Sequence, residues 1–181
     1  KAYSSSRNDV TLCDMQFVSW VLSQFSTIDQ VKDALSGLDL VTLDHRIGAV
    51  HWRITEPGGR MVVLEVVGGV PQFYENKLGV ITNAPGFQWH MTNLNNYVNL
   101  MPGSAPNNTI APGITLQPLG HGSGMLGLPG DYTSPSRFVR ATFFQTTAPV
   151  WPDGFSTVVQ AFHILNNFDI PIGSQHLQKD I

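Results

Sequence analysis

The sequence predicts an α+β protein in which helices accompany an antiparallel sheet. Apolar residues recur at helical spacing over residues 11–25, which favours a helix with a buried face. From Ala49 the apolar period changes to two over several short segments, which is typical of strands. Short connections rich in turn residues, such as Glu56-Pro57-Gly58-Gly59-Arg60, favour an antiparallel meander.

The remaining elements follow from local signals along the chain. A capping box is predicted at Ser26-Thr27-Ile28-Asp29, where it opens a helix over residues 28–35. Residues 38–48 are predicted as loop. The expected strands are residues 50–55, 61–67, 71–76 and 79–82. Further helices are expected over residues 87–100, with Trp89 and Val98 among the buried side chains, over 134–146 with Ser134 at the N-cap, and up to Phe168 with Asp153 or Ser156 as cap.

Composition narrows the class of protein. The 181 residues suit one domain with a sizeable core. Hydrophobic residues make up 42% and charged residues only 13%, so some apolar surface is expected to pack against a partner or a segment outside the chain. The net charge of −3 comes with no basic patch suited to nucleic acid, and no apolar run approaches a membrane span.

Asn83 marks the first candidate site. It follows a short apolar run and stands two residues before Pro85, where proline disfavours helix and the chain is expected to turn. Loops at strand ends commonly carry function. The Asn83 amide could donate to a developing oxyanion, or the residue could serve in an Asx-type turn.

Other motifs have simpler interpretations. Residues 122–127 match the dinucleotide pattern GxGxxG, but the strand before it and the helix within it are missing. Its glycines are better explained by positive φ or close backbone approach. The six histidines show no metal-ligand spacing, and Cys13, the only cysteine, falls on the helical apolar pattern. A single cysteine leaves the redox compartment open, and cytoplasm and periplasm both stay possible.

Arg137 is the second candidate. It falls in the first turn of a predicted helix, where a cation opposes the helix dipole. An anion or a polar site near it would offset that cost, whereas an ordinary surface arginine is the alternative.

Longer motifs point to a known family. They are residues 81–85, 89–97 and 124–141, together with His51-Trp52 and residues 161–165 of the last predicted helix. In these segments, which run over nearly the whole chain, the sequence resembles the choloylglycine hydrolase family. That family contains bile salt hydrolases and penicillin V acylases.

The resemblance implies a four-layer αββα fold of the N-terminal nucleophile hydrolases, and cleavage of a linear amide. It implies a cysteine nucleophile at the mature N-terminus, whose α-amino group, with an ordinary pKa of about 8, acts as the base. The oxyanion-stabilising asparagine of the family falls on Asn83 and its active-site arginine on Arg137. No cofactor is implied.

The chain departs from the family in its first residue, which is Lys1 rather than cysteine. Cys13 is internal and lies on a predicted helix, so it does not fit the role of nucleophile. We therefore expect residues 1–181 to be the central portion of a single domain, with the nucleophile segment and the C-terminal strands not in this chain. This portion alone is not expected to catalyse the reaction.

Two hypotheses of function follow. The first is an amide hydrolase acting on conjugated bile salts, penicillin V or an N-acyl homoserine lactone, with Val41 and Leu43 as candidates for lining the acyl pocket. The second is a binding or scaffold protein that kept the fold and lost the nucleophile. Residues 101–119, rich in Pro, Asn and Gly, resemble the subunit-contact insertion of the family, which predicts a homo-oligomer, specifically a tetramer.

Overall fold

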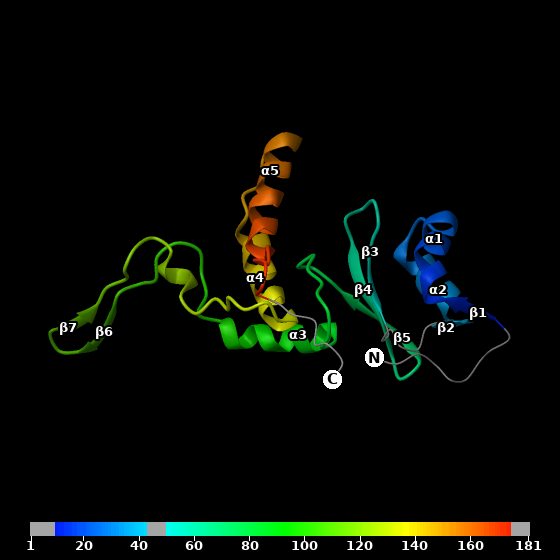
Figure 1. Cartoon of the computed structure of the whole chain (residues 1–181), viewed down its shortest axis with the longest axis horizontal. Helices are drawn as coiled ribbons and strands as arrows, with labels where there is room; N and C mark the ends of the chain where they lie inside the picture. The colour runs from blue at the N-terminus through cyan, green and yellow to red at the C-terminus, as the bar shows by residue number, and fades with distance from the viewer. Residues whose placement is uncertain (1–9, 43–49, 175–181) are drawn as a thin grey trace. The chain divides into compact units, whose positions relative to one another are not determined.

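The computed structural model describes residues 10–42 and 50–174. These residues form two compact units that divide between Trp89 and His90, and Figure 1 labels the helices and strands. The loop predicted over residues 1–10 lies outside the described residues apart from Val10, and so does Leu43.

The first unit opens with a strand rather than with a helix. Strand β1 (Thr11–Cys13) leads into helix α1 (Asp14–Gln24), and strand β2 (Asp39–Val41) pairs with β1 in parallel. The predicted helix over residues 11–25 therefore starts three residues late, and the predicted loop over 38–48 contains a strand. Both strands are three residues long and depend on pairing across the intervening helices, which no local pattern reveals.

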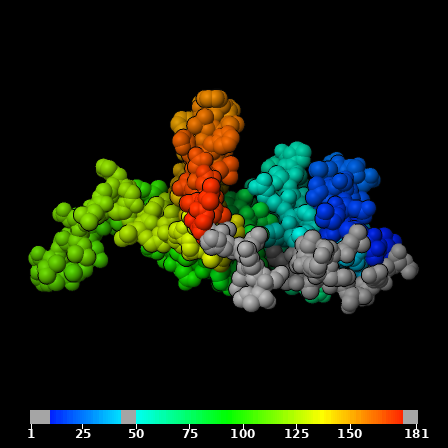
Figure 2. Space-filling view, in the orientation of Figure 1, coloured from blue at the N-terminus to red at the C-terminus, as the bar shows by residue number. Residues whose placement is uncertain are grey.

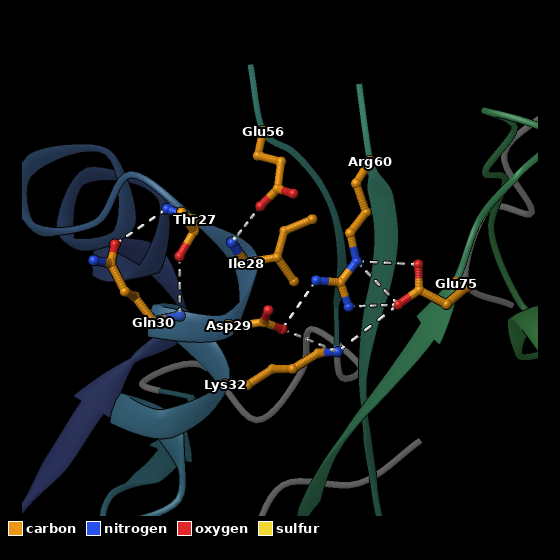
Figure 3. Close-up of polar contacts among 8 residues, drawn as sticks. All are labelled: Thr27, Ile28, Asp29, Gln30, Lys32, Glu56, Arg60 and Glu75. Atoms are coloured by element: carbon orange, nitrogen blue, oxygen red, sulfur yellow. Dashed lines mark hydrogen bonds and ion pairs between the residues drawn. The ribbon is translucent and has the colours of Figure 1, made fainter. Parts of the chain in front are cut away.

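Helix α2 (Ile28–Leu35) has the predicted bounds. Its capping box lies one residue later than expected. The Thr27 hydroxyl accepts the Gln30 N–H at 3.3 Å, and the Gln30 side chain accepts the Thr27 N–H at 3.1 Å (Figure 3). The carboxylate of Glu56 accepts the Ile28 N–H at 2.9 Å. Backbone N–H groups at the start of α2 are thus satisfied from within the helix and by Glu56 outside it.

A network of charged side chains joins α2 to the sheet (Figure 3). The Arg60 guanidinium lies 2.7 Å from a Glu75 oxygen and 2.9 Å from an Asp29 oxygen. Lys32 lies 3.8 Å from each of these two carboxylates. All four side chains are at least partly exposed, so the network orients α2 more than it stabilises the fold.

The meander predicted from the short connections is confirmed. Strands β3 (His51–Thr55), β4 (Met61–Val67) and β5 (Val70–Glu75) form an antiparallel sheet in the order β3-β4-β5. Leu64 and Val66 of β4 pack against buried residues of the helical side, namely Phe17, Val31, Leu35 and Leu40. Because side chains alternate along a strand, Glu65 points to the opposite face.

The strand predicted over residues 79–82 is wrong, since this segment has no strand in the structure. Gly79 has a φ of 68°, which departs from the extended region. Two carbonyl groups of this segment accept hydrogen bonds from side chains rather than from a neighbouring strand. Arg53 donates to the Gly79 oxygen at 2.9 Å, and Asn76 donates to the Val80 oxygen at 3.0 Å.

Helix α3 (Phe87–Asn93) crosses the boundary between the units and continues as the 3₁₀ helix η1 (Leu94–Tyr97). The helical prediction over residues 87–100 is therefore largely confirmed. The expectation of buried Trp89 and Val98 is wrong, because both side chains are exposed.

The 101–119 arm contains a hairpin in the second unit. Strands β6 (Asn108–Ala111) and β7 (Ile114–Leu116) are antiparallel, and Gly113 between them has a φ of 77°. Ile110, Ile114 and Leu116 of this hairpin are exposed, and the space-filling view shows the hairpin region as a narrow arm (Figure 2).

The base of the arm explains the glycine-rich motif. At η2 (Ser123–Met125), Gly124 exchanges backbone hydrogen bonds with Met101 and Gly103. A Cβ on Gly124 would lie 2.9 Å from the Gly103 oxygen and still closer to that of Met101. The predicted close backbone approach is therefore confirmed at this glycine, and Gly127, with a φ of 95°, shows the predicted positive φ.

Two helices complete the described chain. Helix α4 (Ser134–Thr147) has Thr133 rather than Ser134 at its N-cap. Helix α5 (Gly154–Leu165) is capped by Asp153, as predicted, and continues as η3 (Asn166–Phe168). The apolar side of α5, formed by Phe155, Val158, Val159, Phe162 and Leu165, is exposed.

Candidate functional site

Asn83 lies in an exposed bend of the first unit, directly before the cis peptide bond between Ala84 and Pro85. The prediction that Asn83 follows a strand is wrong. The residue lies in an irregular segment that runs from Gly79 to the start of α3. An amide in this position can present its NH₂ group to a ligand.

Side chains of the first unit fasten the chain before Asn83. Arg53 of β3 and Asn76, which follows β5, hold the Gly79 and Val80 carbonyls as described above. Asn76 is almost completely buried, so this end of the segment is fixed from within the unit.

Glu65 fastens the chain after Asn83. Both of its carboxylate oxygens lie 3.1 Å from the Phe87 backbone nitrogen, which donates to them. Gly86 lies so close that a Cβ there would stand 2.8 Å from a Glu65 oxygen. His51 of β3, the residue paired with Glu65, places Nδ1 3.3 Å from the same carboxylate. The bend carrying Asn83 is therefore held at both ends.

The Phe87 ring packs over the same face of the sheet. Its centroid lies 6.2 Å from that of Tyr74 on β5. Burial, with a further contribution from the negative charge of Glu65, raises the pKa of the Tyr74 hydroxyl. A hydrophobic contact and a charged hydrogen bond thus fix the first residue of α3 together.

Arg137 lies in the first turn of α4 in the second unit, as predicted. Its Nε donates to the Tyr132 carbonyl oxygen at 3.1 Å, and the side chain is half-buried. This bond holds the stem of the guanidinium against the loop that precedes α4. The result is an oriented cation, which can hold an anion or a polarised group.

Asp131 organises that loop. It accepts the Ser136 hydroxyl at 2.6 Å and the Thr133 N–H at 2.9 Å. The Ser136 hydrogen bond, followed by those from Thr133, lowers the pKa of Asp131 to about 2. The carboxylate therefore stays ionised at neutral pH and stabilises the N-terminal end of α4.

A second arginine, Arg140, is buried one turn further on. It donates to the Pro129 and Asp131 carbonyl oxygens at 2.8 and 2.7 Å. Arg140 therefore has a structural place beneath the loop, whereas Arg137 stays closer to the surface.

His90 of α3 belongs to the same unit and connects α3 with α4. It is buried, its ring stacks on Phe138 at 4.6 Å, and Nε2 lies 3.5 Å from the Ser134 hydroxyl. The two helices that frame the Arg137 loop are thus packed directly on each other.

The remaining sequence candidates lie elsewhere. Val41 ends β2 and is partly buried, so it lies on a strand and not on the predicted loop. Leu43 falls outside the described residues. Cys13 ends β1 and caps α1, rather than lying within a helix, and its buried thiol donates to the Asp14 carboxylate at 3.3 Å.

Sequence reasoning missed Glu65, Asp131 and Arg140. The signal for Glu65 was a single carboxylate within the apolar run Met61–Val67, since a buried charge requires partners.

Within residues 10–42 and 50–174, no helix is long and apolar enough to cross a membrane. The same residues contain no group of three or more His, Cys, Asp or Glu side chains suited to a metal ion.

Known proteins resemble this chain over most of its length. A bile salt hydrolase/transferase of Clostridium perfringens is 35% identical over 162 residues, which span 87% of this chain and 49% of that protein. The crystal structure of a cysteine-to-alanine mutant of conjugated bile acid hydrolase from Clostridium perfringens matches with a TM-score of 0.79 at 31% identity, over 98% of this chain and 55% of that one.

A more distant structure shares the fold. Penicillin V acylase from Agrobacterium tumefaciens matches with a TM-score of 0.73 at 18% identity, over 99% of this chain and 49% of that one. The chain spans about half the length of each of these relatives.

These similarities confirm the predicted fold class, the α+β fold of the N-terminal nucleophile hydrolases with its αββα layers. Residues 1–180 match the family described as linear amide C–N hydrolases, choloylglycine hydrolase family. The chain belongs to the choloylglycine hydrolase family, as the motifs around Asn83 and Arg137 predicted.

Proposed function

We propose that this chain is part of a hydrolase of linear amide C–N bonds, with Asn83 as its oxyanion donor. The observation that carries the proposal is the anchoring of the Asn83 bend at both ends, by Arg53 and Asn76 before it and by Glu65 after it. An oxyanion donor accelerates amide cleavage only if it is already oriented when the charge develops. We also propose that residues 1–181 belong to a single domain.

The chemistry starts with a cysteine nucleophile at the mature N-terminus, which is a cysteine other than Cys13. Its thiolate attacks the amide carbon, and the carbonyl oxygen becomes an oxyanion that accepts a hydrogen bond from Asn83. The α-amino group of the cysteine, which has taken the thiol proton, gives it to the amine as the tetrahedral intermediate expels that amine and leaves an acyl-enzyme. Water then attacks the thioester and releases the acid together with the free thiol.

Arg137 supplies a fixed positive charge in this scheme. A guanidinium held by Tyr132 through Nε can hold the catalytic cysteine and its developing charge in place. Val41 and Leu43 are proposed to line the pocket for the acyl group.

The proposed substrates are conjugated bile salts or penicillin V. The full-length protein would be incubated with each of them and with an N-acyl homoserine lactone, and the released amine measured by chromatography and mass spectrometry. Release from a conjugated bile salt or penicillin V supports the proposal, and release from the lactone alone supports the alternative substrate. No release from any of the three contradicts the hydrolase assignment.

A second function is a binding or scaffold protein of the same fold. It predicts that the full-length protein binds these amides, as measured by calorimetry, but releases no amine. We further propose that the protein is a homo-oligomer, specifically a tetramer, assembled through the 101–119 arm. Its exposed hairpin with Ile110, Ile114 and Leu116 supports a contact role for that arm.

A further inference from the structure

We infer that Glu65 is a positioning residue for the reaction, acting on Asn83 through the backbone of Gly86 and Phe87. This inference rests on the proposed function of Asn83. It assigns a role to a carboxylate on the central strand of the sheet, which the mechanism above does not use.

The burial of Glu65 is the first part of the argument. The residue is 2% exposed in a strand whose neighbours on both sides, Leu64 and Val66, are fully buried. A carboxylate in such a place destabilises the fold unless its oxygens accept hydrogen bonds from donors. An apolar residue would fit the pattern of this strand better, so the contacts of Glu65 must account for a buried carboxylate at this position.

Those contacts are directed at the bend. The Phe87 N–H belongs to the first turn of α3, where backbone N–H groups have no acceptor within the helix. Both carboxylate oxygens of Glu65 accept its hydrogen bond, each 3.1 Å from the Phe87 nitrogen. The contact joins residues 22 positions apart in sequence. It therefore fixes the start of α3, four residues after Asn83, to the middle of the sheet.

Gly86 lies in close contact with the Glu65 carboxylate. A Cβ at this position would lie 2.8 Å from a Glu65 oxygen, closer than non-bonded atoms approach, so the carboxylate stands directly against the backbone of the bend. Gly58 in the β3–β4 turn offers a matched comparison, because a Cβ there would meet nothing within 4 Å.

Two further neighbours of Glu65 lie on the adjacent strands. His51 and Gln72 are its cross-strand neighbours, and both belong to the sheet itself. The contacts of Glu65 with Gly86 and Phe87, by contrast, reach the segment that carries Asn83. Small displacements of a catalytic donor cost about 10²-fold in rate, so a loosened bend should reduce turnover more than substrate binding.

A double-mutant cycle in the full-length protein tests the inference. We expect Glu65→Gln to lower kcat by about 10-fold to 10²-fold with KM changed less than twofold. In an Asn83→Ala background the same substitution should change kcat less than twofold, because the donor that Glu65 positions is gone. Equal effects in both backgrounds would show that Glu65 does not act through Asn83, and would overturn the inference.

Two further measurements complete the test. Gly86→Ala should reproduce the loss in kcat, whereas Gly58→Ala should leave kcat unchanged. Hydrogen exchange at the Phe87 amide should become at least about tenfold faster in Glu65→Gln. The exchange readout needs no activity, so a protein without hydrolase activity but with this change would contradict the proposed function and not the anchoring. An unchanged exchange rate would refute the anchoring itself.

Discussion

The Glu65 carboxylate and the Phe87 backbone N–H meet at 3.1 Å, although the two residues are 22 positions apart in sequence. Through this contact the central strand of the sheet controls where α3 begins, and with it one end of the Asn83 bend. The other end is held by Arg53 and Asn76. If Asn83 acts as proposed, its position depends on these polar residues of the scaffold.

Substitutions of two arginines one turn apart in α4 should have different effects, one mainly on stability and the other mainly on activity. Arg140 is buried and donates to two carbonyls, so Arg140→Ala should lower the free energy of unfolding by about 2–4 kcal/mol. Arg137→Ala should cost about 1 kcal/mol but lower kcat at least about tenfold. Urea denaturation and steady-state kinetics of the full-length protein measure both effects. A larger loss of stability in Arg137→Ala than in Arg140→Ala would contradict these assignments.

We expect Asp131 to stabilise the folded protein in a pH-dependent way. Its hydrogen bonds to Ser136 and Thr133 lower its pKa from the ordinary 3.8 to about 2, so the folded state favours the ionised carboxylate. This stabilisation is complete above about pH 4 and is lost as the pH falls toward 2. The difference in melting temperature between wild type and Asp131→Asn should therefore be largest at neutral pH and shrink in acid. Asp33→Asn, at an exposed position of α2, serves as control, and a difference independent of pH would refute the prediction.

The cap of α2 gives a local test of stability. Thr27→Ala removes the side-chain half of the capping box (Figure 3) and should lower the free energy of unfolding by about 1 kcal/mol. Ser26→Ala is the matched control, because Ser26 contacts Gln30 through its backbone N–H, and it should cost less than about 0.5 kcal/mol. Equal losses in chemical denaturation would mean that the Thr27 hydroxyl is not the cap.

The 101–119 arm should be needed for assembly. Replacing residues 104–120 by a short glycine–serine linker removes the β6–β7 hairpin and keeps the contacts of Met101 and Gly103 with Gly124. We expect a smaller assembly by light scattering, with the melting temperature of the remaining subunit measured alongside. An unchanged oligomer would refute the proposed role of the arm.

Strong local signals carried the successful sequence predictions. The bounds of α2, the apolar run of β4 and the Asp153 cap of α5 all depend on residues within a few positions of one another. Those elements could be predicted because local sequence and the final fold agree there.

The failures have a common physical cause in long-range pairing. Strands β1 and β2 exist only through each other, and the segment after Gly79 gives its carbonyls to Arg53 and Asn76 instead of to a strand. The motifs made Asn83 and Arg137 candidates, but the residues that hold their loops, Glu65 and Asp131, are visible only once the chain is folded. Val41 appeared to belong to a loop for the same reason.

The kinetics of Asn83→Ala in the full-length protein test the central claim most directly. If the Asn83 amide stabilises the oxyanion, this substitution should lower kcat for amide hydrolysis by about 10²–10³-fold, while the melting temperature stays close to that of the wild type because the side chain is exposed. A kcat near that of the wild type would remove Asn83 from the mechanism and contradict the account.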